Sequence, residues 1–113
     1  MRFHLAQFYG TENWYRHGLI RSILYTDGVK YVAETGGAYW LIDEVAIAQM
    51  QRAIRGQVFQ VWKLKVTGES AVLTCEDGNN NLVSRKKITF TDFPLPEITF
   101  WLRDNVIMLP SEY

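Results

Sequence analysis

His17 is the residue whose type is best suited to acid–base chemistry in this sequence. A histidine titrates near neutral pH, so Arg16, Asp27 or Glu34 could complete an acid–base site around it. The alternative is that His17 lies in the last turn of a short helix, where the helix dipole favours a cation. A lone histidine without a fixed partner is rarely diagnostic. We favour the structural interpretation and predict no catalytic residue.

Cys75 is the single cysteine, which excludes an internal disulfide and a cysteine zinc cluster. A cysteine nucleophile needs a neighbouring base and a site that favours the thiolate. Cys75 falls on the apolar side of an alternating strand pattern, so we predict a buried core residue. The possible metal ligands show no coherent spacing, and they are His4, His17, Asp43 and Glu44. We therefore predict no metal site and no cofactor.

Gly36 and Gly37 precede an expected helix, where backbone amides could bind a phosphate. No Lys-Ser or Lys-Thr pair and no further glycine follow, so the phosphate-loop pattern is incomplete. We interpret the pair as flexible backbone at a tight strand-to-helix connection. Because Tyr39 and Trp40 follow directly, a small pocket here stays open as an alternative.

Basic residues cluster on two expected strands, at Lys63, Lys65, Arg85, Lys86 and Lys87. A basic sheet face beside an exposed Trp62 or Trp101 could hold single-stranded nucleic acid. Alternation, however, places Trp62 on the strand face opposite Lys63 and Lys65. Twelve basic and twelve acidic residues also cancel, which argues against a dedicated DNA-binding surface. We favour a solvated face and keep nucleic-acid binding as an alternative.

The aromatic residues are the most suggestive group. Four Trp, six Tyr and six Phe are more than a core of 113 residues easily buries, and aromatic side chains are enriched at the centres of protein interfaces. We expect the tryptophans in the core. We predict a protein-binding surface within residues 24–43, at Tyr25, Tyr31, Glu34 and Tyr39. Self-association through an exposed strand is compatible with this surface.

The N-terminal half of the chain predicts one hairpin, with a helix before it and a helix after it in the sequence. A short helix is expected over residues 12–17, with Thr11 as its N-cap. Strands over 21–26 and 29–34 are expected to join at Asp27-Gly28, because Asp-Gly between β-rich runs is a strong hairpin signal. A long helix over about residues 38–55 follows and ends at Gly56.

The C-terminal half predicts strands. They are expected over 57–66, 71–76, 82–90, 97–102 and 106–109. Pro94 and Pro96 make residues 91–96 an irregular connection. The order of elements predicts an α+β fold, an antiparallel β-sheet meander packed against one long helix (about 38–55) with a short N-terminal helix.

Length and composition predict one domain over residues 1–113. The 48% hydrophobic content is enough to form a core, so the chain is not expected to be disordered. The first eight residues lack the apolar region of a signal peptide, and no run is long enough to span a bilayer. We expect a cytoplasmic protein that makes no membrane contact.

Four blocks carry a resemblance, at residues 10–18, 25–43, 73–78 and 90–96. They resemble a family of short proteins from bacteria and their phages or mobile elements, a domain of unknown function. The resemblance covers nearly the whole chain, and the block over 25–43 is its most specific part. It implies a small accessory protein encoded by a phage or mobile element, and it assigns no site residue.

These observations leave three hypotheses for the function. The first is a non-enzymatic protein that binds another protein, such as a host defence component of the CRISPR-Cas kind. The second is a nucleic-acid-binding accessory that uses the basic residues named above. The third is a small enzyme or nucleotide-binding protein that uses His17, Glu34 and the Gly36-Gly37 pair.

Overall fold

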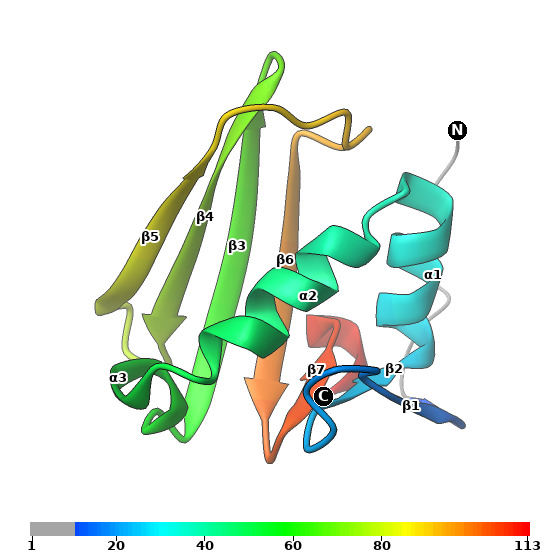
Figure 1. The fold of residues 1–113 in the computed structure, drawn as a ribbon, viewed down its shortest axis with the longest axis vertical. Helices are drawn as coiled ribbons and strands as arrows, with labels where there is room; N and C mark the ends of the chain where they lie inside the picture. The colour runs from blue at the N-terminus through cyan, green and yellow to red at the C-terminus, as the bar shows by residue number, and fades with distance from the viewer. Residues whose placement is uncertain (1–10) are drawn as a thin grey trace.

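The structure is a computed structural model that describes residues 11–113 (Figure 1). Its elements in chain order are β1 (Trp14–Arg16), β2 (Leu24–Thr26), α1 (Asp27–Gly36), α2 (Tyr39–Ala48), α3 (Arg52–Arg55), β3 (Phe59–Thr67), β4 (Ser70–Asp77), β5 (Leu82–Ile88), β6 (Glu97–Arg103), β7 (Val106–Met108) and the short 3-10 helix η2 (Pro110–Glu112). The predicted α+β class is confirmed.

The strands form one seven-stranded sheet in the order β1-β2-β7-β6-β3-β4-β5. The predicted hairpins between β3 and β4, β4 and β5, and β6 and β7 are all present. The wholly antiparallel meander is wrong in two places, because β2 pairs with β7 in parallel and β6 lies beside β3 rather than beside β5. Parallel neighbours need a long crossover connection, and here it comprises α1, α2, α3 and the strands β3 to β6.

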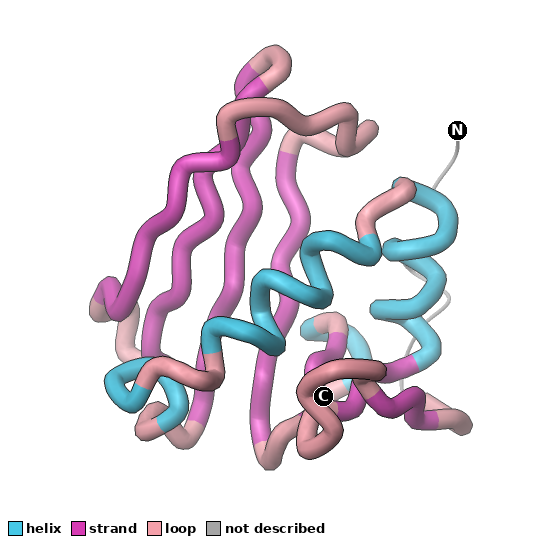
Figure 2. Tube along the Cα trace, viewed as in Figure 1, coloured by secondary structure: helices cyan, strands magenta, loops and turns pink. Residues whose placement is uncertain are grey.

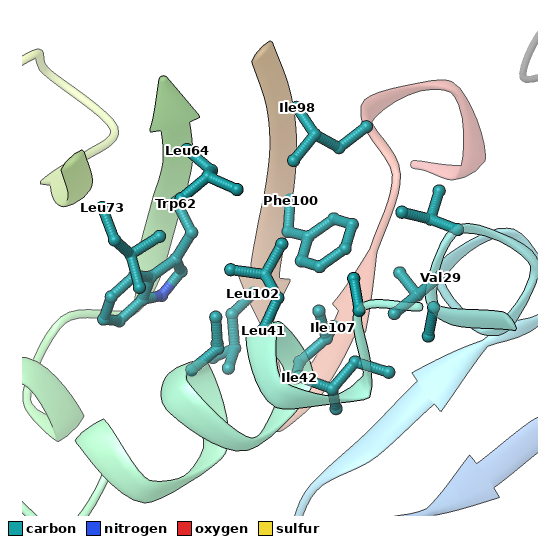
Figure 3. Packing of buried hydrophobic residues seen from close by; sticks show 14 of the residues in the cluster. Val29, Leu41, Ile42, Trp62, Leu64, Leu73, Ile98, Phe100, Leu102 and Ile107 are labelled. Atoms are coloured by element: carbon teal, nitrogen blue, oxygen red, sulfur yellow. The ribbon is translucent and has the colours of Figure 1, made fainter. Parts of the chain in front are cut away.

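Helix α2 crosses one face of the sheet, in front of β6 and β3 (Figure 1). It buries residues at helical spacing, namely Leu41, Ile42, Val45 and Ala46. These pack on sheet residues that alternate along the strands, including Trp62, Leu64, Phe100 and Leu102 (Figure 3). We call this the covered face.

The second face of the sheet carries the intervening residues of the same strands. On β3 and β6 these include Lys63, Lys65, Thr99 and Trp101, all less buried than their neighbours in sequence. Among residues 11–113, the C-terminal Tyr113 packs on this face, beside Phe59 and Trp101. We call it the open face.

The predicted hairpin at Asp27-Gly28 is wrong, because residues 27–36 form helix α1. Thr26 is its N-cap, and its Oγ1 accepts a hydrogen bond from the backbone N–H of Val29 at 3.4 Å. Residues 29, 32, 33 and 36 are buried, which is a helical period rather than strand alternation. Thr26 therefore both ends strand β2 and caps helix α1, so the chain passes directly from strand to helix where a hairpin turn was predicted.

The predicted helix over about 38–55 is interrupted, so one long helix is wrong. Helix α2 ends at Ala48, and Gln51 has extended backbone (φ −83°, ψ 125°) before the four-residue α3. At the break, the Gln49 side chain donates to the carbonyl of Val45 at 3.1 Å and to Oε1 of Gln60 at 2.8 Å. Because Gln60 lies on β3, the hydrogen bond from Gln49 connects the helical segment to the sheet at the break.

The predicted short helix over 12–17 is also wrong, because residues 14–16 form β1 at the edge of the sheet. The backbone N–H of His17 donates to the carbonyl of Ile23 at 2.8 Å, which closes the loop before β2. Strand β2 covers only 24–26 of the strand predicted over 21–26. Figure 2 shows this loop and the irregular connection from β5 to β6, which was predicted.

Candidate functional site

A hollow of about 270 Å³ lies between the loop after β1, strand β2 and helix α2. Its lining residues are His17, Gly18, Leu19, Tyr25, Tyr39, Ile42, Asp43 and Ile47. Two predicted interface residues, Tyr25 and Tyr39, are among them. The loop brings residues 17–19 against α2, which lies more than twenty positions later in the chain.

His17 forms the polar part of this hollow. Its Nε2 lies 2.7 Å from Oδ1 of Asp43. Its Nδ1 accepts hydrogen bonds from the backbone N–H groups of Leu19, at 3.2 Å, and Ile20, at 2.9 Å. Because Nδ1 is the acceptor, Nε2 carries the proton and donates to Asp43. Both ring nitrogens are thus engaged in holding the loop.

The acid–base alternative considered for His17 paired it with Arg16, Asp27 or Glu34, and the structure gives the two carboxylates other partners. Asp27 accepts from the Tyr15 hydroxyl at 2.9 Å and from the backbone N–H groups of Glu12 and Asn13. Glu34 accepts from the Tyr39 hydroxyl at 3.2 Å and pairs with Lys30 at 3.6 Å. The partner of His17 is Asp43, which lies 26 positions later in the chain, and no sequence motif links the two residues. Neither the burial of His17 nor its contact with Asp43 can be read from the sequence.

An apolar rim surrounds the hollow. Leu19 is 71% exposed, Ile47 45% and Tyr39 43%. On α2, residues 39, 43 and 47 recur every four positions and therefore share one side of the helix. Met50, just beyond α2, is also exposed. Several apolar residues of this segment thus face solvent rather than the sheet.

The carboxylate of Asp43 interrupts this apolar rim. Its side chain is 57% exposed although Oδ1 accepts from His17. A carboxylate fixed by a hydrogen bond and surrounded by apolar side chains is a defined acceptor for a cation or an N–H donor. The hollow can therefore bind a group with an apolar body and a positively charged end.

A chain of tyrosines and charges runs beside the hollow. The rings of Tyr15 and Tyr25 stack at 5.6 Å, and the Nζ of Lys30 lies 4.3 Å from the Tyr15 ring centroid. Burial raises the pKa of Tyr39, and its hydrogen bond to Glu34 raises that pKa further. These contacts hold Tyr25 and Tyr39 in place.

Tyr31 is not among the residues that line the hollow. It is half-buried on α1, one position after Lys30. The structure thus brings Tyr25, Glu34 and Tyr39 close together and leaves Tyr31 outside that group.

Gly36 and Gly37 do not present free amides to a ligand. Gly37 has left-handed backbone (φ 62°), and its N–H donates to the carbonyl of Ala33. The N–H of Ala38 donates to the same carbonyl at 2.8 Å. This is a helix C-cap in which glycine supplies the positive φ. The pair ends α1 and connects it to α2, a helix-to-helix connection rather than the predicted strand-to-helix one.

Cys75 is buried on the covered face, as predicted. Burial raises the pKa of its thiol to about 12, and the nearby carboxylates of Glu76 and Asp77 raise it as well. At neutral pH the thiolate, which is the reactive form, is therefore scarce. This placement matches a core residue.

The basic residues separate into two groups. The register places Lys63, Lys65, Arg85 and Lys87 on the open face. Lys86 points the other way and contacts both carboxylate oxygens of Glu44 on α2 at 2.8 Å. Trp62 is buried on the covered face, as its alternation predicted, and its Nε1–H donates to Gln60. Trp101 lies on the same face as the lysines.

Residues 11–113 lack two kinds of feature. No group of three or more His, Cys, Asp or Glu side chains has the arrangement of a metal site in this part of the chain. No helix within the same residues is both long enough and apolar enough to cross a membrane.

Comparisons with known proteins place the sequence in one group. Neither the curated proteins nor the solved structures contain a match to the chain. A family model described as a family of unknown function (DUF6876) matches residues 1–113. The match extends over the blocks that suggested a domain of unknown function. The chain therefore belongs to the DUF6876 family.

Proposed function

We propose that this chain is a binding protein that recognises another protein through the rim of the hollow. The docking surface comprises Leu19, Tyr25, Tyr39, Asp43 and Ile47. The observation that carries the proposal is the exposure of apolar side chains around a fixed carboxylate. Exposed apolar patches with polar borders mark interaction sites, and tyrosine is common among the residues that dominate binding energy.

The chemistry of the docking surface favours a basic, amphipathic partner segment. Asp43 can pair with a lysine or arginine, while Leu19 and Ile47 contact apolar side chains on either side of it. Glu34 adds a second carboxylate beside Tyr39. A segment that places one cation between two apolar residues fits this pattern of charge and apolar surface.

The resemblance described above suggests where such a partner is found. If the chain is encoded by a phage or mobile element, its partner is expected to be a host protein, such as a defence component. Inhibition would follow when the bound chain covers a basic segment that the host protein needs for its own contacts. We thus propose both a host protein as the partner and a phage or mobile element as the origin of the chain.

The test compares variants in a capture experiment from lysates of cells that encode the chain. Leu19→Ser with Ile47→Ser removes two exposed apolar side chains without opening a core cavity. Val58→Ser with Leu82→Ser is the matched control, because both residues are exposed and lie outside the docking surface. Proteins retained by the wild type and the control but absent from the first variant are the predicted partners.

The affinity of an identified partner then decides the outcome. Removal of two central apolar side chains is expected to raise the dissociation constant by at least about tenfold, which corresponds to about 1.4 kcal/mol. The control pair should leave it within about twofold. Equal retention by all three proteins, or a partner without a basic segment at the contact, would show that the surface is assigned wrongly.

A further inference from the structure

The open face carries a cluster of three aromatic rings. Trp101 contacts Phe59 with ring centroids 5.2 Å apart, and Tyr113 lies 5.5 Å from Trp101 and 6.1 Å from Phe59. Tyr113 is 64% exposed, so part of the cluster is accessible to solvent. Arg103 lies over the Tyr113 ring at 5.2 Å. Exposed rings beside a guanidinium are the elements on which nucleic-acid bases stack.

Cations extend from this cluster across the sheet. Arg103 is on β6, Lys63 and Lys65 on β3, and Arg85 and Lys87 on β5. The sheet order β6-β3-β4-β5 puts these strands side by side. With strands about 4.8 Å apart, the cations span roughly 15 Å from β6 to β5.

Carboxylates on the same face neutralise only part of this charge. Glu76 pairs with Lys63 at 3.5 Å, and Glu97 lies directly opposite Lys65 in the register. The strand positions of β3 to β6 that face this side therefore hold five cations and two anions, and Asp104, just after β6, pairs with one of these cations, Arg103, at 3.7 Å. The excess is positive although the formal net charge of the chain is zero.

A hollow of about 350 Å³ lies next to the aromatic cluster. Trp14, Arg103 and Tyr113 line it, together with the apolar Val106 and Met108 and the acidic Asp104 and Glu112. Trp14 is 56% exposed at the edge of the sheet. The aromatic and apolar lining residues suit a planar ring. Arg103 is paired with Asp104 at 3.7 Å, so the phosphates are expected to contact the cations of β3 and β5 instead.

We infer that the open face binds single-stranded nucleic acid. Bases stack on Trp101 and Tyr113, one base enters the hollow beside Trp14, and the phosphates contact Lys63, Lys65, Arg85 and Lys87. Accessible bases are needed for stacking, so a duplex fits the face poorly. This site lies on the sheet face opposite α2 and does not depend on the docking surface.

The charged edge strand has another explanation that the test must separate. Lysine and arginine on an edge strand prevent pairing with other chains, and that role needs no ligand. It predicts no salt-sensitive binding to nucleic acid. If the open face is a nucleic-acid site, salt-sensitive binding must be observed.

Fluorescence anisotropy with labelled oligo(dT), oligo(rU) and a duplex, each of about 15 nucleotides, tests the inference. Single strands are expected to bind more tightly than the duplex, and the two homopolymers distinguish DNA from RNA. With about four phosphate contacts, affinity should fall roughly 50-fold between about 50 and 200 mM salt.

Variants assign the binding to the open face. Lys63→Gln with Lys65→Gln should lower affinity and reduce the salt slope by about 0.7 for each lysine that no longer binds a phosphate. Tyr113→Ala should lower affinity about tenfold without changing the salt slope, because it removes stacking and no charge. Arg52→Gln with Arg55→Gln is the control, since it removes two charges from α3.

Circular dichroism confirms that each variant is folded before its affinity is compared. Absence of salt-sensitive binding by the wild type would overturn the inference. So would equal binding of duplex and single strand, or an equal fall in affinity in the Arg52 and Arg55 control.

Discussion

The imidazole of His17 and the carboxylate of Asp43 are joined by a 2.7 Å hydrogen bond between residues 26 positions apart. The bond connects the loop after β1 to the exposed side of α2. The same histidine accepts two backbone N–H groups through Nδ1. His17 thus gives the hollow its shape, and Asp43 gives it charge.

The first prediction concerns this histidine. His17→Ala should destabilise the fold by about 2–3 kcal/mol, because a buried side chain with three hydrogen bonds is removed and two backbone N–H groups are left without their acceptor. Asp43→Asn keeps an acceptor for Nε2 and should cost less than about 1 kcal/mol. Urea denaturation measures both. Equal effects of the two changes would show that His17 does not organise the loop.

The second prediction concerns the end of the chain, where Glu112 caps helix α1. Its carboxylate accepts from the Thr26 hydroxyl at 2.6 Å, from the Gly28 N–H at 3.0 Å and from the Leu109 N–H at 2.9 Å. A Cβ at residue 28 would lie 2.5 Å from Oε1 of Glu112 and 2.6 Å from Cδ1 of Leu109.

Gly28→Ala should therefore lower the free energy of unfolding by about 1–3 kcal/mol, because the added methyl group displaces the capping carboxylate. Gly18→Ala is the matched control, since a Cβ there meets no atom within 4 Å. It should change stability by less than about 0.5 kcal/mol. Thermal denaturation that gives the two variants the same midpoint would contradict this description of the cap.

The third prediction concerns pH. Desolvation acts to raise the pKa of Asp27, but hydrogen bonds from Tyr15, Glu12 and Asn13 outweigh it and lower that pKa below 3.8. A carboxyl whose pKa is lower in the folded state stabilises the fold above its unfolded pKa and loses this contribution as pH falls through the folded value.

Asp27→Asn should accordingly be less stable than the wild type at pH 7. The difference should shrink once the pH falls below 3.8 and vanish below the folded pKa of Asp27. Urea denaturation over a series of pH values measures it. A difference that is constant over the whole series would mean that the charge of Asp27 is not what stabilises the fold.

The fourth prediction concerns Cys75. With a thiol pKa of about 12, the thiolate fraction at pH 8 is roughly a thousandfold smaller than for an ordinary cysteine of pKa about 8.5. A thiol reagent should react very slowly with the native protein and rapidly in urea. Rapid reaction without denaturant would place the thiol at the surface.

The sequence predicted the C-terminal half of the fold well because its signals there are local. Ala71, Leu73 and Cys75 alternate with Val72, Thr74 and Glu76, and the first set forms the buried face. Gly68, with positive φ, and the Asp77–Asn81 turn mark the ends of strands. Such signals need only neighbours in the chain.

The N-terminal half was predicted poorly because local signals conflict there. Asp27-Gly28 is typical of a hairpin, but Thr26 before it is also a good N-cap, and tertiary packing of Val29 and Val32 decides for the helix. The parallel pairing of β2 with β7 joins residues more than eighty positions apart. No local pattern predicts such a pairing.

The candidate site was predicted only in part for the same reason. Tyr25, Glu34 and Tyr39 come close together through α1 and α2, whereas the role of Asp43 depends on a loop contact to His17. The residues that share the open face can be identified only when strand alternation and sheet order are both known. Alternation placed the lysines opposite Trp62, but only the sheet order and register bring Trp101 and Arg85 onto their side. Tyr113 reaches this face through its ring contacts with Phe59 and Trp101.

Photo-crosslinking tests the proposed docking surface most directly. A photoreactive phenylalanine replaces Tyr39 on the rim or, as the control, Phe90, which is 68% exposed and does not line the hollow. Mass spectrometry identifies the crosslinked peptide. We predict an adduct at position 39 with a partner segment that carries a lysine or arginine between apolar residues, and none at position 90. An adduct at position 90 alone, or the same adduct at both, would contradict the proposed docking surface.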